Sequence, residues 1–260
     1  MNLDEIRRLF TQDQRMQVEY SDARREVLPH VVRHVNTTGI DGTVLYARLD
    51  AANADRIIEE QIAYFEGIGQ DFEWKCFDYD EPPDLKQRLE RRGFVQEEEG
   101  GSVMVLEVRQ APAVLRQAVT HDVRRMDDPE EMSRAVRAVE GAVWDLDFTR
   151  LTGVLAEDMR RSPEVRSIYV AYAGDQPVAT AWIYFPPHSR FASLWGGSTR
   201  AEYRGRGLYT ALLAIRLQEA LRRGVTYLSV DASSMSRPIL EKYGFVKIAA
   251  ESPMMWRCKP

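Results

Sequence analysis

The run Glu202-Tyr203-Arg204-Gly205-Arg206-Gly207-Leu208-Tyr209-Thr210 places two glycines and two arginines just before an apolar helical pattern. Glycine permits a tight turn and lets an anion approach main-chain N–H groups without a Cβ in the way. The first N–H groups of a helix lack internal partners and carry the positive end of its dipole. With Arg204 and Arg206 beside them, they would bind a phosphate or pyrophosphate. The alternative is an ordinary turn with solvated arginines.

A second group of residues has side chains that could act as a general base. The candidates are Glu140, Asp145, Asp147, His188 and Asp231. Trp144-Asp145-Leu146-Asp147-Phe148 interrupts two predicted helices, and its aromatic rings and acids could bind a cationic group. We therefore favour Asp145 and Asp147 as catalytic residues. A packed inter-helix loop is the alternative for this segment, and a bound water could replace any side chain as the base.

Composition limits the classes of protein that fit. The chain has 260 residues and a formal net charge of −5, with 35 basic residues scattered among 40 acids. We expect no nucleic-acid partner, because no basic stripe is present, and no membrane partner, because apolar runs are short. The N-terminal residues show no secretory pattern, and Cys76 and Cys258 cannot build a metal cluster alone. A cytoplasmic protein without a metal is the expectation.

The elements around the glycine run follow from hydrophobic periodicity. Asp128-Pro129-Glu130-Glu131 predicts a helix start, and a second helix is expected at about 148–161. Strands are expected at 118–123, 167–173, 177–185 and 191–198, with a Gly174-Asp175 hairpin turn. A long helix at 207–223, a strand ending at Asp231, a short helix and a strand at 253–258 follow. This order predicts an α/β (α+β) fold with a mixed sheet flanked by helices.

The chain also contains an internal repeat. Leu89-Glu90-Arg91-Arg92-Gly93-Phe94-Val95 recurs as Leu240-Glu241-Lys242-Tyr243-Gly244-Phe245-Val246, at an offset of 151 residues. Phe77–Asp80 lies over Leu228–Asp231 at the same offset, and each half has a long helix before its strand. A duplicated architecture is therefore predicted, with a linker at 109–118.

Residues 119–260 resemble the GNAT superfamily of acetyl-CoA-dependent acetyltransferases. The glycine run matches the family motif Q/R-x-x-G-x-G/A in either of two frames, each with one departure. The resemblance implies acetyl-CoA as cosubstrate and a small-molecule amine as acceptor. It also implies a cofactor-binding set, comprising Ser198, Thr199, Arg200, Arg204, Gly205, Arg206, Gly207, Tyr209, Thr210 and Ser233. Ser198–Arg200 would pair with the pantetheine arm, and a backbone N–H near Ser198 would polarise the thioester carbonyl.

Two departures from the family bear on chemistry. Leu240 stands where members often carry a Tyr that protonates the departing thiolate, and Ser233 stands in the place of an Asn. The strand 191–198 also lacks the acid that many members use as a base. We therefore weigh two functions, an N-acyltransferase acting by direct attack in a ternary complex and a CoA-binding regulatory or sensing module without turnover. A role with an unrelated phosphate ligand is a third.

The first half is expected to be a degenerate copy. At the offset of 151 residues, Asn53-Ala54-Asp55-Arg56 replaces the glycine run, so both glycines are lost and an acid stands in the anion's place. This half also lacks room for the full set of elements before residue 43. We expect an incomplete GNAT-like domain at 1–112 that walls the acceptor site, and a catalytic domain at 113–260. A homodimer is compatible with the sequence.

Overall fold

The structure is a computed structural model that describes residues 2–38, 41–96 and 99–258. By their contacts the residues form two compact units. The first comprises Met1–Met104, Asp231–Pro238 and Lys247–Pro260, and the second comprises Val105–Val230 and Ile239–Val246. In the described part of the chain, no helix is long and apolar enough for a membrane crossing.

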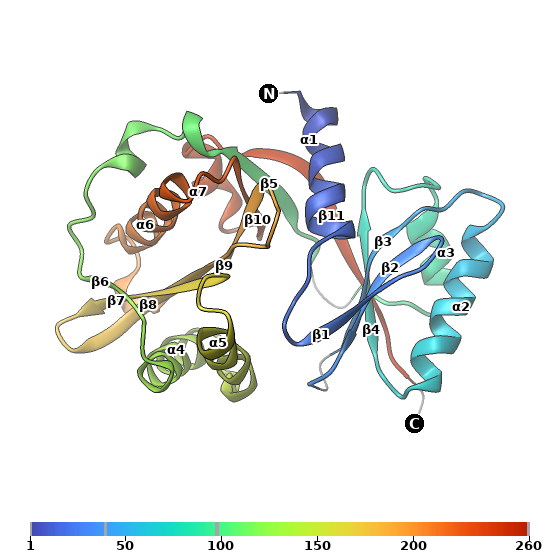
Figure 1. Ribbon diagram of the computed structural model, residues 1–260, viewed down its shortest axis with the longest axis horizontal. Coiled ribbons are helices and arrows are strands. Elements are labelled where there is room, and N and C mark those ends of the chain that lie inside the picture. Colours follow the sequence, from blue (N-terminus) through green and yellow to red (C-terminus); the bar gives the residue numbers. More distant parts are fainter. Residues whose placement is uncertain (1, 39–40, 97–98, 259–260) are drawn as a thin grey trace. The chain divides into compact units, whose positions relative to one another are not determined.

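The first unit is a mixed sheet with helices on both faces. Its strands run in the order β1 (Ala23–Val27), β2 (Val31–Asn36), β3 (Gly42–Ala47), β4 (Phe72–Phe77) and β11 (Val246–Trp256). On one face lie α2 (Ala54–Gly67) and α3 (Leu85–Arg91) (Figure 1). These helices bury apolar side chains against β4 and β11. On the other, α1 (Leu3–Phe10) continues into the π-helix η1 (Thr11–Met16), and Phe10 packs edge-on against Phe77.

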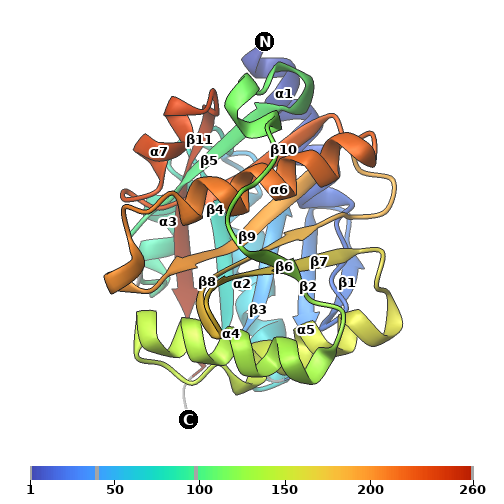
Figure 2. The same ribbon diagram turned by 90° about the vertical axis from the view of Figure 1, so that its left-hand side faces the viewer.

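The second unit carries the glycine run. Its strands run in the order β5 (Ser102–Glu107), β10 (Tyr227–Ala232), β9 (Phe191–Thr199), β8 (Gln176–Tyr184), β7 (Arg166–Ala173) and β6 (Val123–Arg125). The helices α4 (Pro129–Trp144) and α5 (Thr149–Arg161) cover one face, and α6 (Leu208–Arg222) crosses the other (Figure 2). The remaining elements are η2 (Val108–Gln110), η3 (Ala113–Arg116), η4 (Ala201–Tyr203) and α7 (Arg237–Lys242).

Each unit takes a strand from the other half of the sequence. The C-terminal strand β11 pairs antiparallel with β4, from Glu251 opposite Phe77 to Trp256 opposite Phe72. Its repeat counterpart β5 lies beside β10. The last strand of each repeat is thus exchanged, so the compact units do not follow the order of the sequence. The boundary expected between residues 112 and 113 stays a prediction about the repeats.

The predicted elements recur with shifted ends. All helices expected in the second half form, and Asp128 caps α4 by accepting from the N–H groups of Glu130 and Glu131. The strand expected at 118–123 is shorter and later, as β6. In the first half, Asp84 does not cap α3 with its side chain, because its carboxylate pairs with Arg88 and Arg91 instead.

Before residue 42 the first half holds more than the sequence patterns predicted. α1, η1, β1 and β2 correspond in order to the helix and strand elements that precede β9 in the second half. Among the residues that the structure describes, this half has no counterpart of β6, so the N-terminal copy is incomplete. The mixed sheets and their helices agree with the predicted tandem fold.

Candidate active site

The glycine run forms a turn that ends at the first residue of α6. Gly205 and Gly207 have φ angles of +75° and +80°, a region that residues with a Cβ rarely occupy. Gly207 is the N-cap residue, and its carbonyl accepts the first helical hydrogen bond, from the N–H of Ala211. The N–H groups of Leu208, Tyr209 and Thr210 therefore lie at the free end of the helix.

The space over this turn is open. A Cβ built on Gly205 would meet no heavy atom within 4 Å, so a ligand can approach the backbone there. A Cβ on Gly207 would lie 3.4 Å from His121 Cε1. The Nε2 atom of His121 lies 2.9 Å from the carbonyl oxygen of Arg206. His121 thus borders the loop, although no sequence pattern had indicated it.

The arginines around the turn are positioned mainly by backbone carbonyls. Arg204 Nε donates to Thr199 O (3.2 Å) and Arg206 donates to Glu202 O (3.0 Å). Of the arginines at this turn, Arg200 alone pairs with an acid among the described residues, namely Glu202 at 3.1 Å. Since a carbonyl does not neutralise a guanidinium, Arg204 and Arg206 keep their charge for an anion at the helix N-terminus.

A β-bulge interrupts β9 beside the turn. Thr180 pairs with Ser198 and Trp182 pairs with Trp195, so Gly196 and Gly197 together lie opposite one residue of β8. Gly196 has a φ of +60°, and a Cβ there would lie 1.9 Å from the Trp182 ring. At Gly197 a Cβ would lie 3.2 Å from the Tyr209 ring. Only glycine fits the first position, and Tyr209 packs along the bulge.

Beyond the bulge, β9 presents a free edge. Its parallel pairing with β10 covers only Phe191–Ser193 against Tyr227–Ser229, while β9 continues to Thr199. The N–H of Arg200 donates to Val178 O of β8. Because N–H groups alternate along a strand, Thr199 directs its N–H to the opposite edge. This edge can pair with an extended amide-containing arm.

A buried carboxyl lies behind this edge. The side chain of Glu140 on α4 is 2% exposed and accepts from Thr180 Oγ1 (2.5 Å), Ser198 Oγ (2.7 Å) and Trp144 Nε1 (3.0 Å). Burial raises the pKa of Glu140, against the lowering effect of these three donors. Glu140 and Ser198 thus form a hydrogen-bonded pair whose carboxyl holds a proton more readily than a surface acid.

The other predicted acids lie in different environments. Asp145 is exposed and ends α4 with a φ of +55°. Asp147 accepts from the N–H (2.8 Å) and Oγ1 (2.6 Å) of Thr149, and these bonds lower its pKa. His188 is exposed in the loop after β8. Asp231 lies 3.5 Å from Lys75 Nζ, which also pairs with Glu251 at 2.9 Å.

The short helix α7 contributes packing near the turn. Leu240 is fully buried, so the position where the family resemblance implied a Tyr lies in the apolar core. The hydroxyl of Tyr243 lies 2.8 Å from Thr210 Oγ1 in the first turn of α6. Ser233 Oγ accepts from the N–H of Ser236 (3.3 Å), so this side chain organises the start of α7.

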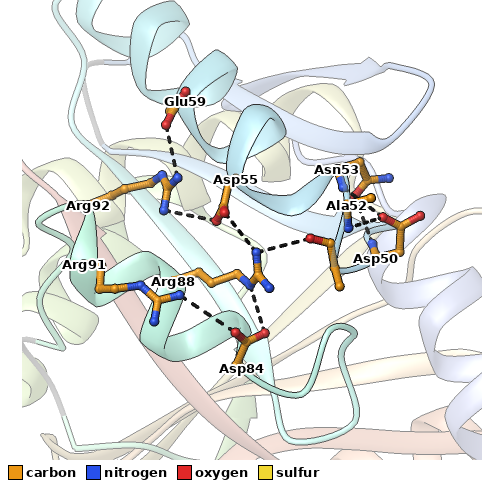
Figure 3. Close-up of polar contacts among 10 residues, drawn as sticks. Asp50, Ala52, Asn53, Asp55, Glu59, Asp84, Arg88, Arg91 and Arg92 are labelled. Atoms are coloured by element: carbon orange, nitrogen blue, oxygen red, sulfur yellow. Dashed lines mark hydrogen bonds and ion pairs between the residues drawn. The ribbon is translucent and has the colours of Figure 1, made fainter.

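The counterpart of the glycine turn in the first half is filled by ion pairs, as Figure 3 shows. Asp55, in the first turn of α2, contacts Arg88 at 3.0 Å and Arg92 at 3.1 Å. Arg92 also pairs with Glu59 at 3.1 Å, and Arg88 with Asp84 at 2.9 Å. A carboxylate of the chain itself thus stands where an anion could sit on the repeat's helix N-terminus.

The structure brings together the residues of the glycine run, β9 and Glu140, and it does not place Asp145 or Asp147 in the buried pair. Sequence reasoning had named Glu140 among the candidates without favouring it. Its position at i, i+4 before Trp144 on a helix with a periodic apolar face was the available signal. In the described part of the chain, no cluster of His, Cys, Asp or Glu is suited to hold a metal ion.

The chain is similar in part of its sequence to a known family and in its fold to solved structures. Residues 130–245 match the Acetyltransferase (GNAT) family. A GCN5-related N-acetyltransferase from Kribbella flavida shares 14% identity and a TM-score of 0.67, covering 97% of this chain and 93% of that one. One from Sphaerobacter thermophilus shares 16% identity and a TM-score of 0.61 over 99% and 86% of the two chains.

A third similar structure is described as a tandem GNAT protein from the clavulanic acid biosynthesis pathway. It shares 12% identity and a TM-score of 0.62, covering 94% of this chain and 86% of that one. At these identities the likeness concerns the fold alone. A search of curated proteins by sequence found no significant match.

Proposed function

Because residues 130–245 belong to the GNAT acetyltransferase family, we propose that the protein is an acyl-CoA-dependent N-acyltransferase that transfers acetyl to a small-molecule amine. The observation that carries the proposal is the placing of three features within one unit. These are the open glycine turn at the N-terminus of α6, the free edge of β9 beyond its bulge, and the buried pair of Glu140 and Ser198 behind that edge.

The residues present fit acetyl-CoA. The pyrophosphate would be held by the N–H groups of the Gly205–Thr210 turn, with Arg204 and Arg206 adding charge. The open space over Gly205 supports this, since a Cβ there would meet no protein atom. The backbone of Thr199 would pair with the pantetheine amides, as β9 has no β10 partner there. When bound, the cosubstrate supplies a thioester carbonyl that an amine can attack.

The proton of the attacking amine needs an acceptor within the same unit. We propose that the Ser198 hydroxyl takes this proton as its own passes to Glu140, whose pKa is raised by burial. The amine nitrogen then forms the bond to the acyl carbon, and the C–S bond breaks with its electron pair on sulfur. The indole of Trp144 is 54% exposed and offers an aromatic face to a cationic amine.

The departing thiolate has no acid at the family's Tyr position, because Leu240 is buried there. A thiol has a pKa of about 8.5, so the thiolate leaves without full protonation. The loss of a general acid would lower the rate by roughly 10²-fold or more without abolishing it. A slow enzyme is therefore the expectation.

The direct test incubates the full chain with acetyl-CoA and a panel of small amines and follows free thiol. The variant Glu140→Gln should lose the acidic limb of the pH profile of kcat/KM. Glu130→Gln, an exposed acid on the same helix, is the matched control and should keep it. Asp145→Asn and Asp147→Asn test the alternative bases, and loss of the limb in either one, with retention in Glu140→Gln, would contradict the role of Glu140.

The buried Leu240 also favours a second function, a CoA-binding module without turnover. Both functions predict acetyl-CoA binding at the glycine turn. They differ in thiol release, which the module would not produce with any amine. Calorimetric binding of acetyl-CoA, without thiol release across primary amines, polyamines and amino acids, would select the module.

A further inference from the structure

The first unit contains a cavity of about 720 Å³ that the acyltransferase proposal does not use. It lies among α1, η1, β1–β3 and the segment that follows β4. The lining residues are Arg7, Arg8, Thr11, Gln12, Arg15, Met16, Gln17, Arg25, Val27, Val32, Tyr46, Ala47, Arg48, Leu49, Tyr79, Asp80 and Glu81. This volume falls within the range of roughly 300–1,000 Å³ that is usual for small-molecule sites.

The charge of the lining is strongly positive. Five arginines face two acids, Asp80 and Glu81. Asp80 is already neutralised, because it makes two hydrogen bonds with Arg15 at 2.6 and 2.8 Å. Both side chains of this pair are buried, at 3% and 7% exposure. The pair forms a fixed part of the wall and leaves Glu81 facing the remaining arginines.

Those remaining arginines are held mainly by carbonyl oxygens. Arg7 Nε donates to Ile248 O (2.7 Å), Arg25 Nε to Met16 O (2.9 Å), and Arg48 to Pro29 O (3.3 Å). The acids near Arg7 and Arg25 are largely exposed and outside the lining, so they screen the charge only weakly. Arg8 has no hydrogen-bond or ion-pair partner from its side chain within the described ranges.

The lining also offers rings and aliphatic side chains. The Tyr79 hydroxyl lies 3.1 Å from Thr11 Oγ1, and the Arg15 guanidinium lies 5.5 Å from the Tyr46 ring centroid. These contacts fix the two tyrosines at the wall. Val27 of β1 is 61% exposed, although it is apolar. The cavity thus combines a cationic rim with a partly apolar surface, which suits an organic anion better than a bare ion.

The repeat explains why a cavity stands here. Ala47–Leu49 corresponds to Ser198–Arg200 at the offset of 151 residues, and Tyr79–Glu81 corresponds to Val230–Ala232. The cavity therefore lies at the end of β3, the strand of the first repeat that corresponds to β9. The helix N-terminus of this repeat is closed to phosphate by Asp55, which pairs with Arg88 and Arg92 (Figure 3). The first half thus lacks a nucleotide-type anchor and keeps a separate pocket.

We propose that this cavity is a binding site for a small organic anion, with one phosphate or carboxylate group and an aromatic or apolar body. Arg8 and Arg48 bind the anionic group by charge-assisted hydrogen bonds. Tyr46, Tyr79 and Val27 contact the body. The site is independent of acetyl-CoA binding in the second unit.

The test uses the full chain and titration calorimetry with phenyl phosphate and benzoate. Benzylammonium and benzyl alcohol serve as probes of similar shape without a negative charge. Both anions, or the phosphate alone, should bind, and the cationic and neutral probes should not. The double variant Arg8→Ala/Arg48→Ala should weaken binding by about tenfold or more, as expected for lost hydrogen bonds to a charged group. Both arginines are exposed, so the variant should fold.

Arg56→Ala is the matched control, because it removes an exposed arginine of the same unit outside the cavity. It should bind the anions as the parent does. Gly207→Val is a second control for the place of binding. If the anion binds at the glycine turn, Gly207→Val should abolish binding and the double variant should retain it. That result would overturn the proposal. So would the absence of anion binding at millimolar concentrations, or equal affinity in the parent and the double variant.

Discussion

The glycine turn allows a sharp test, because the chain offers two glycines in the same unusual backbone conformation. Gly207 has a φ of +80° at the N-terminus of α6, and Gly174 has a φ of +61° in the β7–β8 turn. Replacement of either by Val forces a β-branched residue into a left-handed conformation, at about 1–3 kcal/mol. Since domains are stable by about 5–15 kcal/mol, both variants should remain folded.

The two variants should differ in their affinity for acetyl-CoA. At Gly174 a Cβ would meet no atom within 4 Å, and the turn lies outside the proposed site. At Gly207 the methyl groups would occupy the space in which the pyrophosphate approaches the first N–H groups of α6. Loss of two charge-assisted hydrogen bonds, at about 1.5–3 kcal/mol each, corresponds to a loss of affinity of about 150-fold or more.

The measurement is isothermal titration calorimetry with acetyl-CoA on the parent and on both variants, after circular dichroism has verified folding. Gly174→Val should bind like the parent, and Gly207→Val should bind far more weakly. A folded Gly207→Val protein with the parental Kd would refute the assignment of this turn. Equal losses in both variants would show that general strain, and not the anion site, determines affinity.

Three further outcomes are expected. Leu240→Ala should lower the free energy of unfolding by about 2–5 kcal/mol, because Leu240 is fully buried; urea unfolding measures this, and loss of a limb of the pH–rate profile with unchanged stability would contradict it. Burial raises the pKa of Glu140, so the stability of the parent relative to Glu140→Gln should fall as the pH rises from about 4.3 through the folded-state pKa. Thermal melts of both proteins from pH 4 to 8 measure this. A difference in stability between them that does not change with pH would count against it. Asp55→Asn should leave the Kd for acetyl-CoA unchanged, because Asp55 pairs within the first unit; a change in Kd measured by calorimetry would link that unit to the cosubstrate.

The sequence predicted the elements with strong local signals. Asp128 and Pro129 marked the start of α4, and Gly174 marked the β7–β8 turn. Gly205 and Gly207 were expected to permit a tight turn, and their positive φ angles agree. Gly196 and Gly197, just before Ser198, lie in the bulge that the strand register shows. In these cases a single residue type restricts the backbone.

Features that depend on distant residues could not be predicted in this way. Glu140 is an ordinary helix position by sequence, and the proposal for it rests on its contacts with Thr180 and Ser198 of two strands. His121 precedes β6 and reaches the carbonyl of Arg206, which lies 85 positions later. The Asp84 side chain stands before α3 but pairs with Arg88 and makes no capping hydrogen bond. Local sequence preferences do not show which of several possible partners a side chain will bond in the folded chain.

The exchange of strands has a consequence for the order in which the chain is synthesised. β4 is complete at Phe77, but its partner β11 begins only at Val246. During synthesis, the edge of β4 therefore waits without this partner, and an unpaired edge is a site for aberrant pairing. Most multidomain proteins finish their N-terminal domain first. Here the first unit can complete its sheet only after β11 has been synthesised, so termination before Val246 should leave β4 without this partner.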